Sequence, residues 1–146
     1  MLAVIEFIAI LSGTIFTGAA IYINLVEHPA RMDCDTKIAA TVWAPSYKRA
    51  TVMQASLAIL SFLSGVSAWL LGASVIWLIG AVLIGLVVPF TFIAIMPTNH
   101  RLLESGRDLS SEETKRLLEK WGKLHAVRSA LSLVASVIYL TLLLNP

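Results

Sequence analysis

The sequence predicts an all-α integral membrane protein, built as a four-helix bundle of one domain over residues 1–146. Of these residues, 58% are hydrophobic and only 14% are charged, and the mean hydropathy is +0.82. A soluble domain carries about 25% charged residues. Four apolar stretches reach the ~20 residues that a helix needs to cross a hydrocarbon core. They cover about residues 3–25, 52–71, 74–96 and 124–144.

The distribution of cations predicts the orientation of these four helices. The eleven Lys and Arg residues lie in loop one (24–51), in loop three (97–123), or at Arg128 close to loop three. Neither terminus nor the turn near Gly72 carries a cation. The positive-inside rule therefore places the long loops 1 and 3 in the cytoplasm and both termini on the non-cytoplasmic side. We expect a bacterial inner (cytoplasmic) membrane, the lipid bilayer as a partner, and no nucleic acid.

The first stretch is expected to be a retained helix, because no Lys or Arg precedes it and its apolar run is longer than the hydrophobic region of a signal peptide, which has about 7–15 residues. At its inner end, Asn24, Glu27, His28 and Arg31 share one helical face. Pro29 disfavours helix at His28, so a turn or kink is predicted there. Two interpretations are open: an ordinary helix end with a Glu27–Arg31 pair, or the rim of a ligand pocket.

The second helix follows a loop that is long enough to form a lid. Trp43 and Tyr47 precede the helix, and both residue types are common anchors at membrane surfaces. Tyr47, Gln54 and small residues form one stripe along the helix, which is expected to face the bundle.

The third helix contains Pro89, which is expected to bend it. It closes at the sequence from Met96 to His100. In loop three, Ser110 and Glu113 match a capping box. This pattern predicts that the fourth helix covers 111–144 and that its membrane part begins at 124.

The two halves of the chain resemble each other weakly. Asn24 to Arg31 is similar to Asn99 to Arg101, and Trp43 with Tyr47 is similar to Trp121 with His125, at intervals close to 75 residues. Two-fold repeats are known in membrane proteins. A chance match is an equally good explanation.

The candidate site centres on the fourth helix, where Trp121, His125 and Arg128 stack on one face. A guanidinium inside a membrane-type helix is costly unless it has partners, so Arg128 is predicted to be a site residue. Snorkelling to the headgroups is the alternative. The same leaflet receives further polar side chains from the other helices: Asn24, His28, Tyr47, Gln54, Thr98, Asn99 and His100. Pockets between bundle helices with a few polar groups commonly bind small ligands.

Two kinds of chemistry fit these residues. A metal held by His28, His100, His125 and Glu27 is one, because imidazole and carboxylate are normal ligands. Metal-free acid–base catalysis without any cofactor fits better, since no two of these histidines have a local ligand spacing. A histidine takes up a proton near neutral pH, and Arg128 with Asn99 would stabilise the resulting anion.

Three motifs carry a resemblance to a known family. Pro89-Phe90-Thr91, then Met96-Pro97-Thr98-Asn99 with Leu102, then Trp121 through Leu124 to Arg128 resemble the signature of the anthrone oxygenase-like proteins, small four-helix membrane proteins of which many have unknown function. The resemblance implies oxidation of an anthrone to an anthraquinone, with His125 as the base, Arg128 and Asn99 as oxyanion holders, and Trp121 packed on the substrate. In fungal members the position of His125 is often Asn, which cannot act as that base.

The resulting hypothesis is a membrane-embedded oxygenase acting on a lipid-soluble planar aromatic such as an anthrone or quinone. Its substrate would be bound by Trp121 and by the polar residues of the other helix ends: Asn24, His28, Tyr47, Gln54 and Thr98. The alternative is a non-enzymatic accessory or binding subunit of a membrane complex, in which the small-residue stripes pack against partner subunits or a second copy of the chain.

Overall fold

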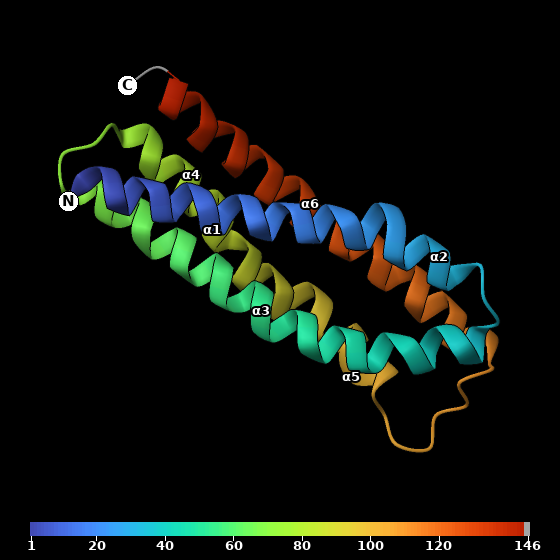
Figure 1. The fold of residues 1–146 in the computed structure, drawn as a ribbon. Helices are drawn as coiled ribbons and strands as arrows, with labels where there is room; N and C mark the ends of the chain where they lie inside the picture. Colours follow the sequence, from blue (N-terminus) through green and yellow to red (C-terminus); the bar gives the residue numbers. More distant parts are fainter. Residues whose placement is uncertain (145–146) are drawn as a thin grey trace.

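The computed structural model describes residues 1–144 as an elongated bundle of four long helices (Figure 1). The last two residues of the predicted domain lie outside the described residues. Each of the four helices is long and apolar enough to cross a membrane. No strand occurs within residues 1–144. The predicted all-α bundle of four helices is therefore confirmed.

The first long helix runs from residue 2 to residue 32 in three parts: α1 (Leu2–Tyr22), the π-helix η1 (Ile23–Glu27) and α2 (His28–Met32). The turn or kink predicted at Pro29 is not what the structure shows. The chain instead widens into a π turn, in which the N–H of His28 donates to the carbonyl of Ile23, five residues earlier. The widened turn lets the helix continue through the proline, which has no N–H to donate.

The second long helix, α3 (Thr36–Leu70), begins far earlier than predicted. Only residues 33–35 separate it from α2, so most of the expected loop one is helical. Asp35 caps the helix by accepting from the N–H of Lys37 at 2.9 Å. Trp43 and the small residues Ala39 and Ala40 are buried in a cluster that includes Leu117 and Trp121. This burial stabilises the first half of α3, which mixes polar and apolar residues, as a helix despite Pro45.

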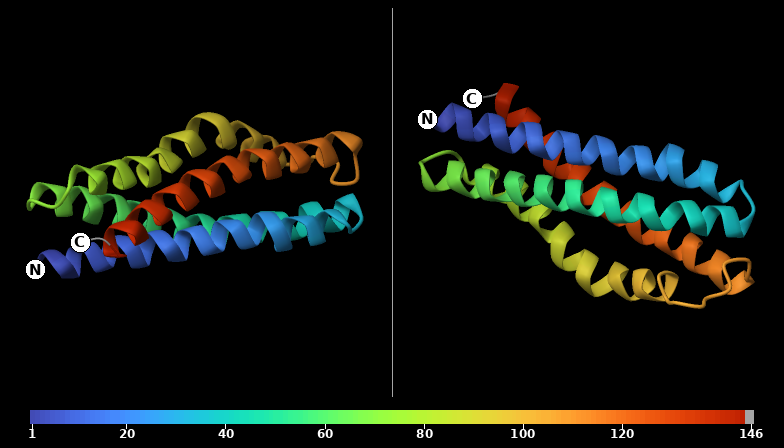
Figure 2. Two further views of the ribbon diagram at one scale, coloured as in Figure 1. Left: turned by 90° about the horizontal axis from the view of Figure 1, so that it is seen from above. Right: turned by 60° about the horizontal axis from the view of Figure 1, so that its bottom comes forward.

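The third helix contains α4 (Val75–Phe90), the π-helix η2 (Thr91–Ile95) and α5 (Met96–Leu102), and the fourth is α6 (Glu112–Leu144). Around the bundle, α1 packs on α3, α3 on α4, α4 on α6, and α6 on α1. The start of α1, the end of α6 and the turn at 71–74 lie at one end, and α2 and the α5–α6 loop lie at the other (Figures 1 and 2). The polar residues predicted to form the site lie toward this second end.

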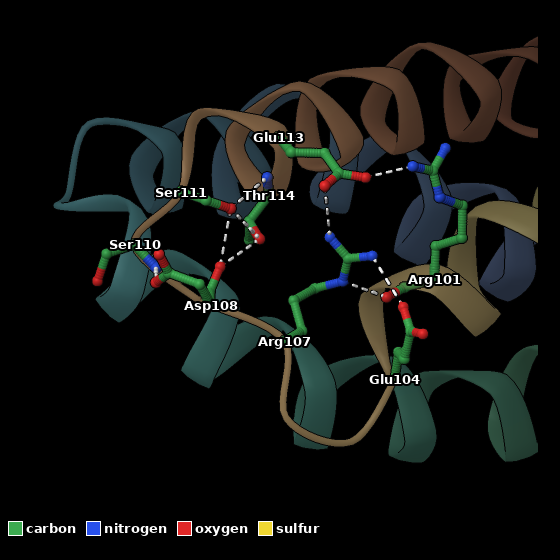
Figure 3. A network of polar contacts seen from close by, with 8 residues as sticks. All are labelled: Arg101, Glu104, Arg107, Asp108, Ser110, Ser111, Glu113 and Thr114. Carbon is green, nitrogen blue, oxygen red and sulfur yellow. Dashed lines mark hydrogen bonds and ion pairs between the residues drawn. The ribbon is translucent and has the colours of Figure 1, made fainter.

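The loop between α5 and α6 is fixed by charged side chains (Figure 3). Arg107 donates to the carbonyl of Arg101 at 2.5 Å and pairs with Glu104 at 3.1 Å and with Glu113 at 3.5 Å. Glu113 also binds Arg101. The predicted Ser110–Glu113 capping box is wrong by one residue, because the cap is Ser111, whose Oγ accepts from the N–H of Thr114 at 3.2 Å. Glu113 is drawn instead toward the two arginines.

Substitution Arg107→Ala is expected to destabilise the fold by about 1–3 kcal/mol, because a largely buried guanidinium loses its charged hydrogen bonds to Glu104, Glu113 and the Arg101 carbonyl. The Arg107 side chain is only 8% exposed. Arg116→Ala is the matched control, since that side chain is 76% exposed and lies 3.7 Å from Glu112. Thermal unfolding in detergent measures both. Equal melting temperatures for the two variants would contradict the prediction.

Candidate functional site

Asn24 links the first helix to α6 through three hydrogen bonds. Its Nδ2 donates to the carbonyl of Gly122 at 3.0 Å, so Oδ1 is the atom that faces His125. Oδ1 accepts from the Ser129 hydroxyl at 2.5 Å and lies 2.7 Å from Nδ1 of His125. A carboxamide oxygen only accepts, so Nδ1 carries the proton. The lone pair of the imidazole is therefore on Nε2.

Arg128 points into the bundle rather than out to the headgroups. The residue is only 9% exposed, and its Nη2 donates to Oε1 of Gln54 at 3.0 Å. The guanidinium carbon lies 5.6 Å from the centre of the Phe16 ring. These two contacts come from α3 and α1, so three helices meet at this one charge. The snorkelling alternative does not describe this geometry.

Three aromatic side chains pack around Trp121. Its ring centre lies 4.9 Å from that of His125, 5.1 Å from His28 and 5.8 Å from Trp43. Trp43 in turn stacks on Tyr47 with an interplanar angle of 2°. Trp121 therefore fixes the position of His125 within the bundle. Most of the surface of Trp121 is covered by its neighbours.

Two small cavities meet at Gln54 and Arg128. The first, of about 20 Å³, is lined by Tyr47, Trp121 and His125 as well as by this pair, and it has room for about one water. The second, of about 80 Å³, extends toward Phe16 and Phe92. Because Gln54 and Arg128 line both cavities, their hydrogen bond stands at the boundary between them.

Arg31 lines the first cavity. The sequence left open whether this residue only pairs with Glu27 or belongs to the rim of a pocket. That pair is present, and Ser46 donates to Glu27 at 2.6 Å. Arg31 is 6% exposed, and its Nε and Nη1 have no acceptor within residues 1–144. The kink predicted at Pro29 would have turned α2 away from the bundle, whereas the continuous helix places Arg31 on the cavity.

Other predicted site residues lie apart from the two cavities. Thr98 and Asn99 are buried on α5 and line neither cavity, and both polar side-chain atoms of Asn99 lack a partner among the described residues. His28 lines, with Asn24, a separate open groove beside α6. His100 is exposed. Within residues 1–144 no three His, Cys, Asp or Glu side chains form a metal-binding group, so His28, His100, His125 and Glu27 are not gathered into one ligand set.

The fold and site define a small bundle of four membrane-length helices with an oriented imidazole and a buried guanidinium on one internal cavity. The chain belongs to the anthrone oxygenase family, whose model matches residues 43–138. It is 28% identical to anthrone oxygenase tpcL of Aspergillus fumigatus over 94% of this chain and 91% of that protein. It is 24% identical to an anthrone oxygenase of Claviceps purpurea over 94% of this chain and 87% of that protein. No solved structure matches the chain.

Gly122 is expected to be essential for the packing of His28. A Cβ atom at this position would lie 2.5 Å from Nε2 of His28, so Gly122→Ala should destabilise the fold by about 1–3 kcal/mol through overpacking. Gly18→Ala is the matched control, because no atom lies within 4 Å of its added Cβ. Combining Gly122→Ala with His28→Ala should recover most of the loss, measured by thermal unfolding. An additive double variant would contradict this assignment.

Proposed function

We propose that this protein is a membrane-embedded oxygenase that oxidises a planar, lipid-soluble aromatic of the anthrone or quinone type. Family membership and the names of the two fungal relatives support the reaction class. The observation that carries the assignment of residues is the shared cavity of His125 and Arg128. On this cavity an imidazole with its lone pair on Nε2 lies beside a guanidinium that is always charged.

The chemistry begins with removal of a proton from the methylene group opposite the substrate carbonyl. His125 Nε2 takes this proton, and the electron pair moves to the carbonyl oxygen, which becomes an enolate held by Arg128. The enolate carbon reacts with dioxygen and gains one oxygen atom as a new carbonyl. The second oxygen atom leaves as water with the two methylene protons, one of which returns from His125. One anthrone and one dioxygen thus give one anthraquinone and one water.

Gln54 is the second oxyanion donor in this proposal, in place of Asn99. Its Oε1 accepts from Arg128, and its Nε2 has no partner among the described residues. Asn99 lies off the cavity, so it would reach the oxyanion only after a shift of α5. Trp121 then orients His125 and offers one edge to the substrate, since its faces are occupied.

The substrate must widen the site to bind. Ligand pockets measure about 300–1,000 Å³, whereas the two cavities measure about 20 and 80 Å³. If Gln54 and Arg128 moved apart, the two cavities would become one. The substrate oxygen would then lie between these two side chains. The cost of breaking this hydrogen bond is offset when the oxygen accepts from the freed guanidinium.

The placement in a membrane belongs to the same proposal. The four helices are long and apolar enough to span a bilayer. The cytoplasmic side of the loops follows from the positive-inside rule. The relatives reported above are fungal, so the bacterial inner membrane stays a prediction, as do a second copy of the chain and a membrane-complex partner.

Arg128→Gln and His125→Gln are each expected to lower kcat/KM for an anthrone by about 10²-fold or more, because each removes stabilisation of the anion or the base. Oxygen uptake by protein in detergent measures this, after subtraction of the uncatalysed rate. Arg49→Gln is the control, since that side chain is exposed. Ligand binding without oxygen uptake in the wild type would favour the alternative of a non-enzymatic binding subunit.

Asn24 acts as a positioning residue. Asn24→Leu removes the acceptor of His125 Nδ1, and kcat is expected to fall by about 10-fold or more while KM changes little, because the wrong tautomer becomes populated. Asn24→Asp retains an oxygen acceptor and should restore most of kcat. If kcat is the same in a folded Asn24→Leu variant, the tautomer assignment fails.

A further inference from the structure

A groove on the outer surface between α3 and α4 adjoins the 80 Å³ cavity. It measures about 470 Å³ and is lined by nine residues, none with a polar side chain. Leu63, Val82 and Leu86 are exposed along it. Phe62 lies close to Gly85, where an added Cβ would meet the ring at 2.7 Å. Its volume falls within the range of ligand pockets, unlike either internal cavity.

The groove and the two internal cavities share residues in series. Ala58 and Val88 line both the groove and the 80 Å³ cavity. Thr51, Gln54 and Arg128 line both that cavity and the 20 Å³ cavity. Three hollows therefore follow one another from the apolar surface of the bundle to the imidazole of His125.

Polarity rises along this series. The groove is apolar throughout, the middle cavity adds Thr51, Thr91, Gln54 and Arg128, and the last one adds Arg31, Tyr47 and His125. A phospholipid acyl chain has no group that matches the inner end. A planar aromatic with an oxygen at one edge fits both the groove and the last cavity. Its rings would pack against the apolar side chains of the groove, and its oxygen would accept hydrogen bonds from the donors of the last cavity.

We propose that the groove between α3 and α4 is the access route by which the aromatic substrate passes sideways from the bilayer to Arg128. The surface of the bundle first receives the rings beside Phe62 and Leu86. The oxygen-bearing edge then passes Ala58 and Val88 and reaches the Gln54–Arg128 pair. This inference rests on the proposed function, since it concerns the same substrate.

The test uses the full chain in phospholipid vesicles and unsubstituted anthraquinone as an unreactive probe. Association is followed by quenching of tryptophan fluorescence in a stopped-flow instrument. Ala58→Leu fills the junction between groove and cavity, and it should lower the association rate constant by ten-fold or more. Leu86→Phe narrows the groove at a residue that is 46% exposed and should lower the rate constant several-fold.

Leu60→Phe is the matched control, because Leu60 is 47% exposed on α3 and does not line the groove. Its rate constant should stay within two-fold of the wild type. Leu86→Phe keeps the test decisive if Ala58→Leu unfolds, as judged by thermal unfolding. Wild-type rate constants in the folded groove variants would overturn the access route alone, and this result is also expected if an acyl chain occupies the groove. A wild-type protein that binds no anthraquinone would overturn the proposed function and the route together.

Discussion

The hydrogen bonds of one amide, that of Asn24, hold the candidate site together. They connect η1 to three residues of α6, namely Gly122, His125 and Ser129. Asn24 lies within a π turn, a local widening that is common at functional sites. In a low-dielectric interior such a satisfied network is rigid, and a partly satisfied one is costly. The orientation of His125, and with it the side of the ring that meets the cavity, therefore depends on the first helix as much as on α6.

A π-helix followed by a proline occurs in both the first and the third long helix. The π-helix at 23–27 is followed by Pro29, and the π-helix at 91–95 is followed by Pro97, so both features recur after 68 residues. The sequence comparison suggested a weak repeat at about 75 residues, carried partly by Trp43 with Tyr47 and Trp121 with His125. In the structure each of these pairs is in ring contact, and Trp43 also contacts Trp121. Proline after a widened turn explains how both helices continue past a residue that usually interrupts them.

Hydropathy predicted the four long helices, because an apolar stretch of membrane length satisfies its backbone hydrogen bonds within the bilayer only as a helix. Hydropathy missed the first sixteen residues of α3, which mix polar and apolar side chains and contain Pro45. Their helical state depends on a cap at Asp35 and on burial of Trp43 against α6, and burial against a distant segment is not visible in local composition. The helical spacing of Trp121, His125 and Arg128 predicted their common face correctly. The same reasoning could not predict that Arg31 lines the cavity and that Asn99 does not. That difference depends on the positions of α2 and α5 relative to the other helices, which the helical spacing of residues does not determine.

The unpaired groups around the first cavity define what it can hold. Five N–H-bearing atoms of its lining residues lack an acceptor within residues 1–144: Arg31 Nε and Nη1, Gln54 Nε2, Trp121 Nε1 and Arg128 Nε. Each buried donor without a partner costs about 1–3 kcal/mol. His125 adds an acceptor to the same lining, the lone pair on its Nε2. A hydrocarbon would leave the donors unsatisfied, whereas an oxygen that becomes negative during the reaction gains from them most when its charge develops. In the proposed reaction, the excess of donors would favour an enolate over its neutral precursor, which is the differential binding that catalysis requires.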